Sequence, residues 1–330
     1  MSFGGINSGN SENKPVSMNY LKWVQQYGII IAFLVISAGI SIMIPQFLTL
    51  TNLLIVVKQI TINAMLAFGV TFVIVSGGID LSMGSVVAVS GVVAALFAQP
   101  ESYPLVVALF AGISVGLLIG LFNGLVITLG HVPSFIVTLG TMTVGRGLAL
   151  IISNGRPISN LSESFGYIGN GVLLGIPFPI IVLAVVFLVC LVVLNKTVLG
   201  RYIYAVGGNE DAARASGINV KKIKITVYTL CGGLSAIGGI ILASRINTGQ
   251  PNVGVAFELD AIAAVVIGGT SLSGGVGTIT GTLIGALLIG VIGNGLDLMN
   301  VSSYYQQVVM GLIIIGAVIL DNLRRKNSIN

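Results

Sequence analysis

The chain has 330 residues, of which 55% are hydrophobic and only 8% are charged, with a mean hydropathy of +1.04 and a net charge of +5. So few charges exclude a water-soluble domain, because such domains carry about 25% Asp, Glu, Lys and Arg. Long apolar runs, several near the ~20 residues that a helix needs to cross the hydrocarbon, favour helices over the ~10-residue alternating strands of a membrane barrel. The sequence therefore predicts an all-α, polytopic membrane protein.

Ten transmembrane helices are expected, with a polar tail at each end of the chain. Residues 1–26 begin with a run rich in Ser, Asn and Gly and are expected to form a disordered cytoplasmic tail. A single transmembrane domain follows at 27–322, and residues 323–330 are expected to form a basic cytoplasmic tail. The expected spans are 27–44, 52–76, 82–98, 104–129, 133–153, 174–195, 223–244, 257–270, 276–297 and 302–321.

The placement of Lys and Arg sets the orientation of these spans. If both tails and the segment 196–222 face the cytoplasm, eleven of the 15 basic residues lie inside, whereas only Arg156 and Arg245 lie outside. Such an excess on one side follows the positive-inside rule. We therefore expect a multi-pass protein of the cell inner (cytoplasmic) membrane with both termini in the cytoplasm.

A polar segment, GRYIYAVGGNEDAARASGINVKKIK at 200–224, interrupts the apolar sequence. Asn209 is a suitable N-cap residue, and Glu210 and Asp211 follow where the helix dipole favours anions. Gly217 can supply the left-handed conformation that ends a helix. The pattern predicts a capped helix of about two turns, too short to be stable alone, which indicates that a partner holds it. A loop made basic only to set the topology is the alternative.

Two pairs of short motifs indicate internally repeated halves. VSGGIDLSMGS at 75–85 resembles IGGTSLSGGVG at 267–277, and LIGLFNGL at 118–125 resembles LIGVIGNGL at 288–296. Duplicated halves are common in transporters, where the substrate crosses at the interface between the repeats.

The Gly- and Ser-rich motifs of the first pair lie at expected span ends. Their unequal separation from the second pair indicates that one of the segments 82–98 or 257–270 is re-entrant or broken rather than spanning. The motifs are candidates for hinges or gates in which Ser hydroxyls satisfy freed backbone groups, and tight turns with helix caps are the alternative. The candidate gate residues are Gly77, Gly78, Asp80, Ser82, Gly268, Gly269 and Ser273.

Motifs for enzymatic chemistry are absent from the sequence. No G-x-x-x-x-G-K-[ST] phosphate loop occurs, so this chain is not expected to hydrolyse ATP. Cys190 and Cys231 lie inside apolar runs and are expected to be small buried side chains. The single histidine, His131, has no partners for catalysis, and no His or Cys cluster indicates a metal site.

Several motifs together resemble one family of transporters. They are GRYIYAVGGNEDAARASGINVKKIKITVYTLCG, SGGIDLSMGS, FNGLVITLG, ELDAIAAVVIGGTSLSGG, GTLIGALLIG and VSSYYQ. The chain resembles ribose-type permeases, the membrane subunits of ATP-binding-cassette (ABC) importers of monosaccharides, within the branched-chain amino acid and monosaccharide permease superfamily. The resemblance implies that the short cytoplasmic helix sits in a groove of an ATPase subunit. The residues to which it gives this coupling role are Asn209, Glu210, Asp211, Ala213, Arg214, Ser216 and Gly217.

The resemblance also implies the substrate and the partners. The substrate would be ribose or a close relative, delivered by an external sugar-binding protein. A second permease copy would complete a homodimer in the lipid bilayer, and a cytoplasmic ABC ATPase subunit or tandem ATPase would bind ATP and Mg. No cofactor on this chain and no nucleic acid is implied. The alternative function is a secondary transporter or channel for small polar solutes that acts without an ATPase, although no carboxylate is expected at mid-membrane, where an ionisable relay usually lies.

Polar side chains within the spans are candidates for the sugar pathway, because a sugar offers hydroxyls and a weakly apolar ring face. Hydrogen bonding between helices is the alternative role for each of them. Arg146 must face protein or water, and pairing with backbone carbonyls or Asp80 competes with a pathway role. The candidates are Gln59, Asn63, Asn123, Thr138, Thr141, Asn294, Tyr304 and Tyr305.

Overall fold

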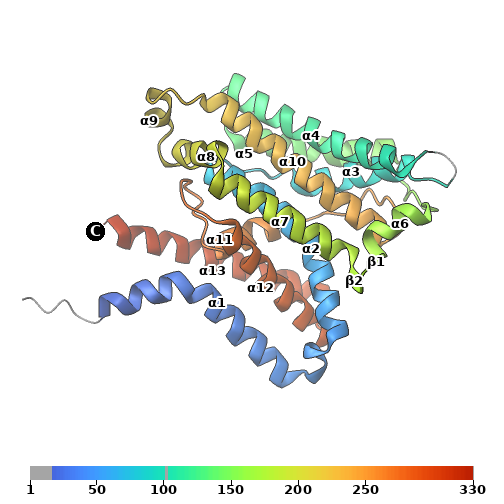
Figure 1. Cartoon of the computed structure of the whole chain (residues 1–330), viewed down its shortest axis with the longest axis horizontal. Helices are drawn as coiled ribbons and strands as arrows, with labels where there is room; N and C mark the ends of the chain where they lie inside the picture. Colours follow the sequence, from blue (N-terminus) through green and yellow to red (C-terminus); the bar gives the residue numbers. More distant parts are fainter. Residues whose placement is uncertain (1–16, 101–102, 330) are drawn as a thin grey trace, which may run out of the picture.

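The computed structural model describes residues 17–100 and 103–329. Ten helices occupy the ten expected spans, and together they form one bundle (Figure 1). The all-α, polytopic prediction is therefore confirmed. These helices are α1 (Ser17–Met43), α2 (Leu50–Val75), α3 (Met83–Phe97), α4 (Leu105–Leu129), α5 (Ser134–Ile152), α7 (Phe178–Lys196), α10 (Val220–Arg245), α11 (Phe257–Ile267), α12 (Ile279–Leu298) and α13 (Ser303–Ile329).

Shorter elements connect these helices. A 3₁₀ turn, η1 (Pro45–Leu48), precedes α2, and α6 (Glu163–Asn170) with the two-residue strands β1 (Val172–Leu173) and β2 (Ile176–Pro177) lies between α5 and α7. The helices α8 (Val198–Gly208) and α9 (Glu210–Ala215) fill the segment between α7 and α10.

Both ends of the chain contain more helix than the sequence predicts. α1 begins at Ser17, so that residues 17–26 are helical, and α13 continues to Ile329, through most of the expected basic tail. The rest of the expected N-terminal tail, residues 1–16, lies outside the described residues. The start of α1 and the end of α13 lie on the same side of the bundle as α8 and α9 (Figure 1).

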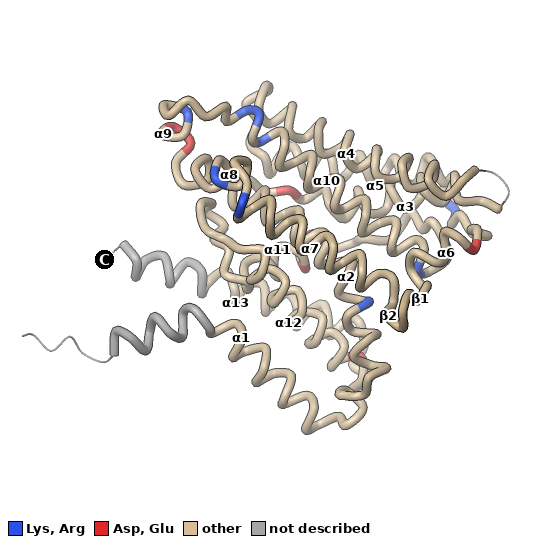
Figure 2. The backbone as a smooth tube through the Cα atoms, viewed as in Figure 1, with Lys and Arg blue, Asp and Glu red and all other residues tan. Residues whose placement is uncertain are grey.

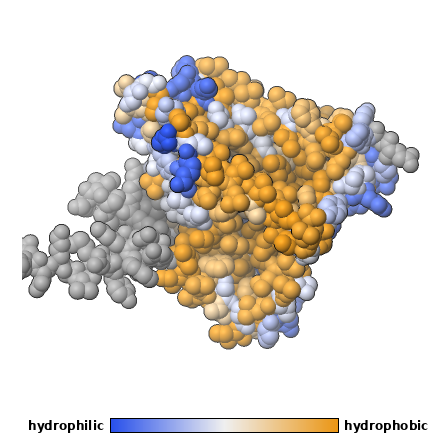
Figure 3. Space-filling model, in the orientation of Figure 1, coloured by the Kyte–Doolittle hydropathy of each residue, from blue (hydrophilic) through white to orange (hydrophobic). Residues whose placement is uncertain are grey.

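The surface has the character that a membrane requires. Among the described helices, six are long and apolar enough to cross a bilayer, namely α2, α4, α5, α7, α10 and α12. The visible face carries a broad hydrophobic belt, with hydrophilic residues gathered at its two ends (Figure 3). The exposed apolar side chains of this belt therefore face lipid rather than water.

A stripe of glycines lets α4 and α10 approach closely. Gly112, Gly116, Gly120 and Gly124 recur every four residues on α4 and therefore share one face. A Cβ on Gly116 or Gly120 would overlap a backbone carbonyl of α10. The large side chains of α4, such as Phe122, lie exposed on another face. Small residues at helix contacts are typical of membrane bundles, which accounts for much of the high glycine content.

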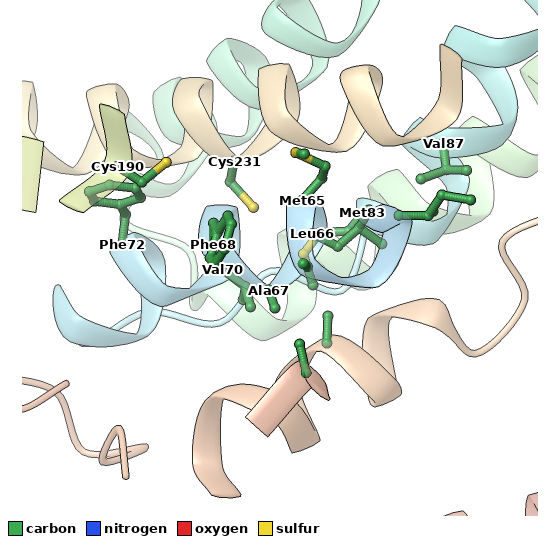
Figure 4. Close-up of a cluster of buried hydrophobic side chains, with 14 of the residues drawn as sticks. Met65, Leu66, Ala67, Phe68, Val70, Phe72, Met83, Val87, Cys190 and Cys231 are labelled. Carbon is green, nitrogen blue, oxygen red and sulfur yellow. The ribbon is translucent and has the colours of Figure 1, made fainter. Parts of the chain in front are cut away.

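The core is centred on α2, whose C-terminal half is almost entirely buried. Phe68 and Phe72 of this helix pack close to Cys190 of α7 and Cys231 of α10 (Figure 4). Both cysteines are buried and free, as the sequence predicts. Apolar side chains of α2, α7 and α10 thus form one continuous core.

We assign the long helices to two repeats of opposite orientation, on the basis of their order and packing. α2–α5 form the first repeat and α10–α13 the second: α10 packs on α3 and α4 of the first repeat, and α2 packs on α11 and α12 of the second. α2 ends on the side of α8 and α9, whereas α10 begins there (Figure 1). This packing and the opposite directions of α2 and α10 are the arrangement that inverted repeats produce, a topology that many transporters share.

The third and eighth expected spans are both half-length helices. α3 has 15 residues and α11 has 11, which gives lengths of about 22 Å and about 16 Å, shorter than the ~30 Å hydrocarbon core. A non-helical stretch precedes each of them, at 76–82 and 246–256. The sequence predicts one broken segment, whereas the structure contains two at equivalent positions of the repeats.

The two pairs of similar motifs differ in where their members lie in the structure. LIGLFNGL lies on α4 and LIGVIGNGL on α12, which are equivalent helices. The stretch 75–85 lies before α3, however, whereas 267–277 lies after α11, so that their structural equivalents are different segments. The similarity of these two stretches therefore reflects the same glycine-turn chemistry on one side of the bundle, not their place in the repeat.

Candidate functional site

The helix α9 has the caps that its sequence predicts. The Asn209 side chain accepts a hydrogen bond from the Ala212 N–H at 2.9 Å, and Gly217 ends the helix with a φ of +82°. Asp211 is exposed, whereas Ala213 is buried and faces the protein. α9 therefore presents its polar residues outward while one small side chain packs inward.

Glu210 ties α9 to the start of α10. Its carboxylate accepts hydrogen bonds from Lys224 Nζ at 2.6 Å and from Arg214 Nη2 at 2.9 Å. Arg214 also pairs with Asp211 at 3.2 Å. Exposed ion pairs contribute little stability individually, so the cluster chiefly fixes the orientation of α9. The charges of the molecule gather around α8, α9 and the start of α10 (Figure 2).

A glycine junction connects α8 to both repeats; it consists of Gly77, Gly207, Gly208, Gly274 and Gly275. The Gly275 N–H donates to the Val75 carbonyl at 2.9 Å. A Cβ on Gly207 would overlap both groups of this hydrogen bond, and one on Gly274 would press on the backbone of Gly77. Three distant segments thus meet backbone to backbone.

Tyr204 anchors α8 to the second repeat. Its hydroxyl donates a hydrogen bond to the Gly277 carbonyl at 2.6 Å, and partial burial raises the pKa of this hydroxyl, so that it stays protonated and can donate. α8 is the helix directly before α9. The loop 268–278, which holds the candidate gate residues Gly268, Gly269 and Ser273, is therefore attached to the helix that carries α9.

A cavity of about 820 Å³, here called the α9 cavity, lies between α9 and the first repeat. Glu210, Arg214 and Lys224 line one side of it, and the candidate gate residues Gly77 and Gly78 line another. His131 also contributes to the wall, which gives this loop residue a place near α9 that its sequence context did not indicate. α9 and the non-helical stretch 76–82 before α3 therefore line the same cavity.

The remaining gate residues of the first repeat form a buried hydrogen-bond network. Asp80 accepts hydrogen bonds from the backbone N–H and the hydroxyl of Ser82, at 2.8 and 2.6 Å. Asn123 donates to the Ser82 hydroxyl at 2.9 Å, and Thr141 donates to Asn123 at 2.6 Å. Of the pathway candidates, Asn123 and Thr141 therefore lie in a network that fixes α3, α4 and α5.

The other pathway candidates are scattered. Asn294 exchanges two hydrogen bonds with Asn52, at 2.9 and 3.0 Å, and Thr138 donates to the Ser134 carbonyl within α5 at 2.9 Å. Tyr304 and Tyr305 are 82% and 70% exposed. Only Gln59 and Asn63 line a cavity together.

That second cavity, here called the polar cavity, has a volume of about 570 Å³ and lies between α2, α11, α12 and α13. Besides Gln59 and Asn63, its wall contains Phe257 and four polar residues that the sequence-based candidates do not include. These are Asp260, Ser303, Gln306 and Gln307. Their signal in the sequence is a polar side chain near the start of an apolar helix, α11 or α13.

Arg146 lies where the two half-length helices begin. Its guanidinium donates to the carbonyls of Val253 and Gly254, the latter at 2.6 Å. A Cβ on Gly84, in the first turn of α3, would overlap the Gly254 carbonyl and the Glu258 carboxylate. Arg146 therefore pairs with backbone carbonyls rather than Asp80 and binds the first repeat to the second.

A bundle of apolar helices that contains two short helices, each preceded by a non-helical stretch, and polar groups that face cavities is typical of membrane transport proteins. The chain belongs to the family described as the permease component of branched-chain amino acid transport systems, whose model matches residues 52–318. It is a transporter subunit, not an enzyme. No solved structure matches the chain.

Curated relatives cover nearly its full length. The ribose import permease protein of Escherichia coli (strain K12) is 47% identical over 307 residues, which are 92% of this chain and 95% of that protein. The ribose import permease protein of Bacillus subtilis (strain 168) is 48% identical over 307 residues, 92% and 94% of the two chains. The L-arabinose transport system permease protein of Escherichia coli (strain K12) is 39% identical over 322 residues, 97% and 98%.

Proposed function

We propose that this chain is the membrane permease of an ATP-driven importer of ribose or a closely similar monosaccharide. Relatives named as ribose import permeases, 47–48% identical over 92% of the chain, carry this proposal. A relative named for L-arabinose is less similar, at 39% identity. Since the sequence contains no phosphate-binding loop, ATP and Mg belong to a separate cytoplasmic ABC ATPase subunit or tandem ATPase.

The ATPase contact falls on α9. The helix is capped at both ends and oriented by the Glu210 ion pairs, and its polar residues are exposed. Closure of the ATPase would displace α9 and α8 together, and the glycine junction would carry the displacement to the broken segments of both repeats. Such a mechanism couples two distinct sites through one mechanical element.

The remaining partners follow from the same function. α9 and both ends of the described chain face the cytoplasm, where the basic residues gather (Figure 2), and the protein lies in the cell inner membrane. An external sugar-binding protein delivers substrate to the opposite face. A second copy of the permease completes a homodimer.

Co-purification with the ATPase tests the role of α9. Glu210→Gln removes both ion pairs of this residue, and Gly217→Val forces a β-branched side chain into a left-handed position. We expect both variants to lose the ATPase and ATP-driven uptake while the purified permease keeps its melting temperature within a few degrees. Glu163→Gln, which changes an exposed carboxylate in the first turn of α6, is the matched control and should keep both activities.

The opposite results would decide against this assignment. Full assembly and full ATP-driven uptake by both α9 variants would remove α9 from the ATPase contact. Sugar flux into vesicles that contain only the purified permease would instead support the secondary transporter or channel.

A further inference from the structure

The polar cavity collects hydrogen-bonding side chains from three helices. Gln59 and Asn63 come from α2, Asp260 from α11, and Gln306 and Gln307 from α13. Positions so far apart in the sequence converge only because α2 of one repeat packs against the other repeat. The cavity therefore lies at the interface between the repeats, where substrate sites of inverted-repeat transporters form.

The polar groups of this cavity keep their hydrogen-bonding capacity free. Within the described residues, Gln306 donates to Asp297 and to the Val301 carbonyl. The side chains of Gln59, Asn63, Asp260 and Gln307, in contrast, form no hydrogen bond with other described residues. Gln59 and Gln307 are exposed, whereas Asn63 and Asp260 are half-buried. A half-buried polar group without a protein partner is unfavourable unless water or a ligand satisfies it.

The corresponding region of the first repeat differs. The helices α3, α4 and α5 are equivalent to α11, α12 and α13, and there Ser82, Asn123 and Thr141 bond to one another. Those hydrogen bonds hold α3, α4 and α5 together. In the second repeat Asn294 pairs with Asn52 of α2, whereas Asp260, Gln306 and Gln307 face the polar cavity.

The wall indicates the chemistry of a ligand. Asp260 is its one carboxylate among the described lining residues, and no Lys, Arg or His lines it, so an anion such as a phosphate would be repelled. Amide groups both donate and accept hydrogen bonds, and a carboxylate accepts two hydroxyl protons. Phe257 and Met310 provide apolar surface for C–H groups. A volume of about 570 Å³ suits a small molecule with some water.

We propose that the polar cavity is a binding site for a neutral polyhydroxylated molecule, in which Asp260 accepts hydrogen bonds from the hydroxyls and selects against anions. The proposal rests on the proposed function in its choice of ribose as the ligand to test. It adds the place of the sugar within the membrane and the residues that recognise it.

Thiol labelling of the purified permease in liposomes tests the site without any ATPase. Asn63→Cys and Gln307→Cys place thiols on the wall, whereas Thr61→Cys places one at a fully buried position of α2 as the control. The natural cysteines are buried, so their background is low. We expect a membrane-impermeant maleimide to label the first two thiols much faster than the third, and ribose, but not inorganic phosphate, to slow this labelling.

Uptake by the complete importer tests Asp260. A hydrogen bond to a charged group contributes about 1.5–3 kcal/mol, so Asp260→Asn should lower the uptake rate at sub-saturating ribose about tenfold or more. The ATPase should still co-purify, because no residue of α8 or α9 lines the polar cavity. Thr143→Val removes an exposed hydroxyl of α5 that lies outside the wall and should leave uptake unchanged.

Each proposal fails on a different result. If wild-type importer takes up ribose with ATP but Asp260→Asn is equally fast, or if ribose does not protect the wall thiols, the binding site is wrong. If the wall thiols are protected by ribose but no ATPase binds and no ATP-driven uptake occurs, the binding site holds and the proposed function is wrong.

Discussion

The amide pair of Asn52 and Asn294 joins α2 to α12 by two hydrogen bonds in a buried position. We expect Asn52→Leu and Asn294→Leu to couple in a double-mutant cycle of thermal stability, by about 1 kcal/mol, the usual strength of such bonds between membrane helices. Asn252 is exposed in the loop before α11, so Asn252→Leu should add to Asn294→Leu without coupling. Additive effects for the Asn52 and Asn294 pair would show that the amides do not interact.

Gly84 makes a second prediction at the residue scale. Because a Cβ there would overlap the Gly254 carbonyl and the Glu258 carboxylate, Gly84→Ala should separate the starts of the two half-length helices. Overpacking of this kind destabilises by about 1–3 kcal/mol, measured as a lower melting temperature in detergent. Gly140→Ala on α5 has nothing near its Cβ and should be neutral. Equal melting temperatures for Gly84→Ala and wild type would contradict the close approach.

At this scale the sequence is informative about residue type but not about partners. Asn63 and Asn123 look alike, each an amide inside an apolar span. The partners that satisfy Asn123 are Ser82 and Thr141, which lie 41 and 18 positions away in the chain, and only the packing of the helices brings them together. The sequence could therefore propose both amides for the pathway but could not tell the bonded one from the free one.

The element α9 is the part of the site that its sequence specifies best. Its N-cap and the glycine that ends it are local signals, and both occur in the structure as expected. α8 was not expected as a helix, because its stability depends on burying Ile203 and Val206 against other elements. Broken segments were expected once rather than twice, because the stretch 246–256 is held by long-range contacts such as those of Arg146.

Removal of the α9 cap gives a prediction for this element. Asn209→Ala deletes the acceptor for the Ala212 N–H and should destabilise α9 by about 1 kcal/mol, which is large for a helix of six residues. Faster hydrogen exchange of residues 210–216 should report this loss. Ser162→Ala, the equivalent change at the N-cap of α6, should affect only 163–170. Unchanged exchange in α9 would mean that its contacts to α10, not its cap, hold it.

For the whole molecule, the inverted repeats fix which features share a side of the membrane. Ser216 follows α9 and Ser164 lies in α6, and both are exposed. In intact cells we expect a membrane-impermeant maleimide to label Ser164→Cys but not Ser216→Cys until the cells are opened, because α9 faces the cytoplasm. The natural cysteines are buried and should stay unlabelled. Labelling of Ser216→Cys in sealed cells would reverse the orientation.

The ten helices could be predicted because each is a local apolar pattern, and LIGLFNGL and LIGVIGNGL lie on α4 and α12, which we assign to equivalent places of the two repeats. The similarity of the other pair of motifs was misleading. Glycine turns at 75–85 and 267–277 resemble each other because both must pass close to α8, although they occupy different places in the repeats. Similar local constraints therefore produced similar sequences at positions that are not equivalent in the two repeats.

The glycine junction contains almost no side-chain atoms between its three segments. Side chains between segments would absorb a small displacement by changing rotamers, whereas main chains in direct contact cannot. Any displacement of α8 would therefore be transmitted to both halves of the bundle at the same time, without being absorbed by side chains. The single short helix α9, acting through α8 on the inner face, would then be enough to make the two halves move together.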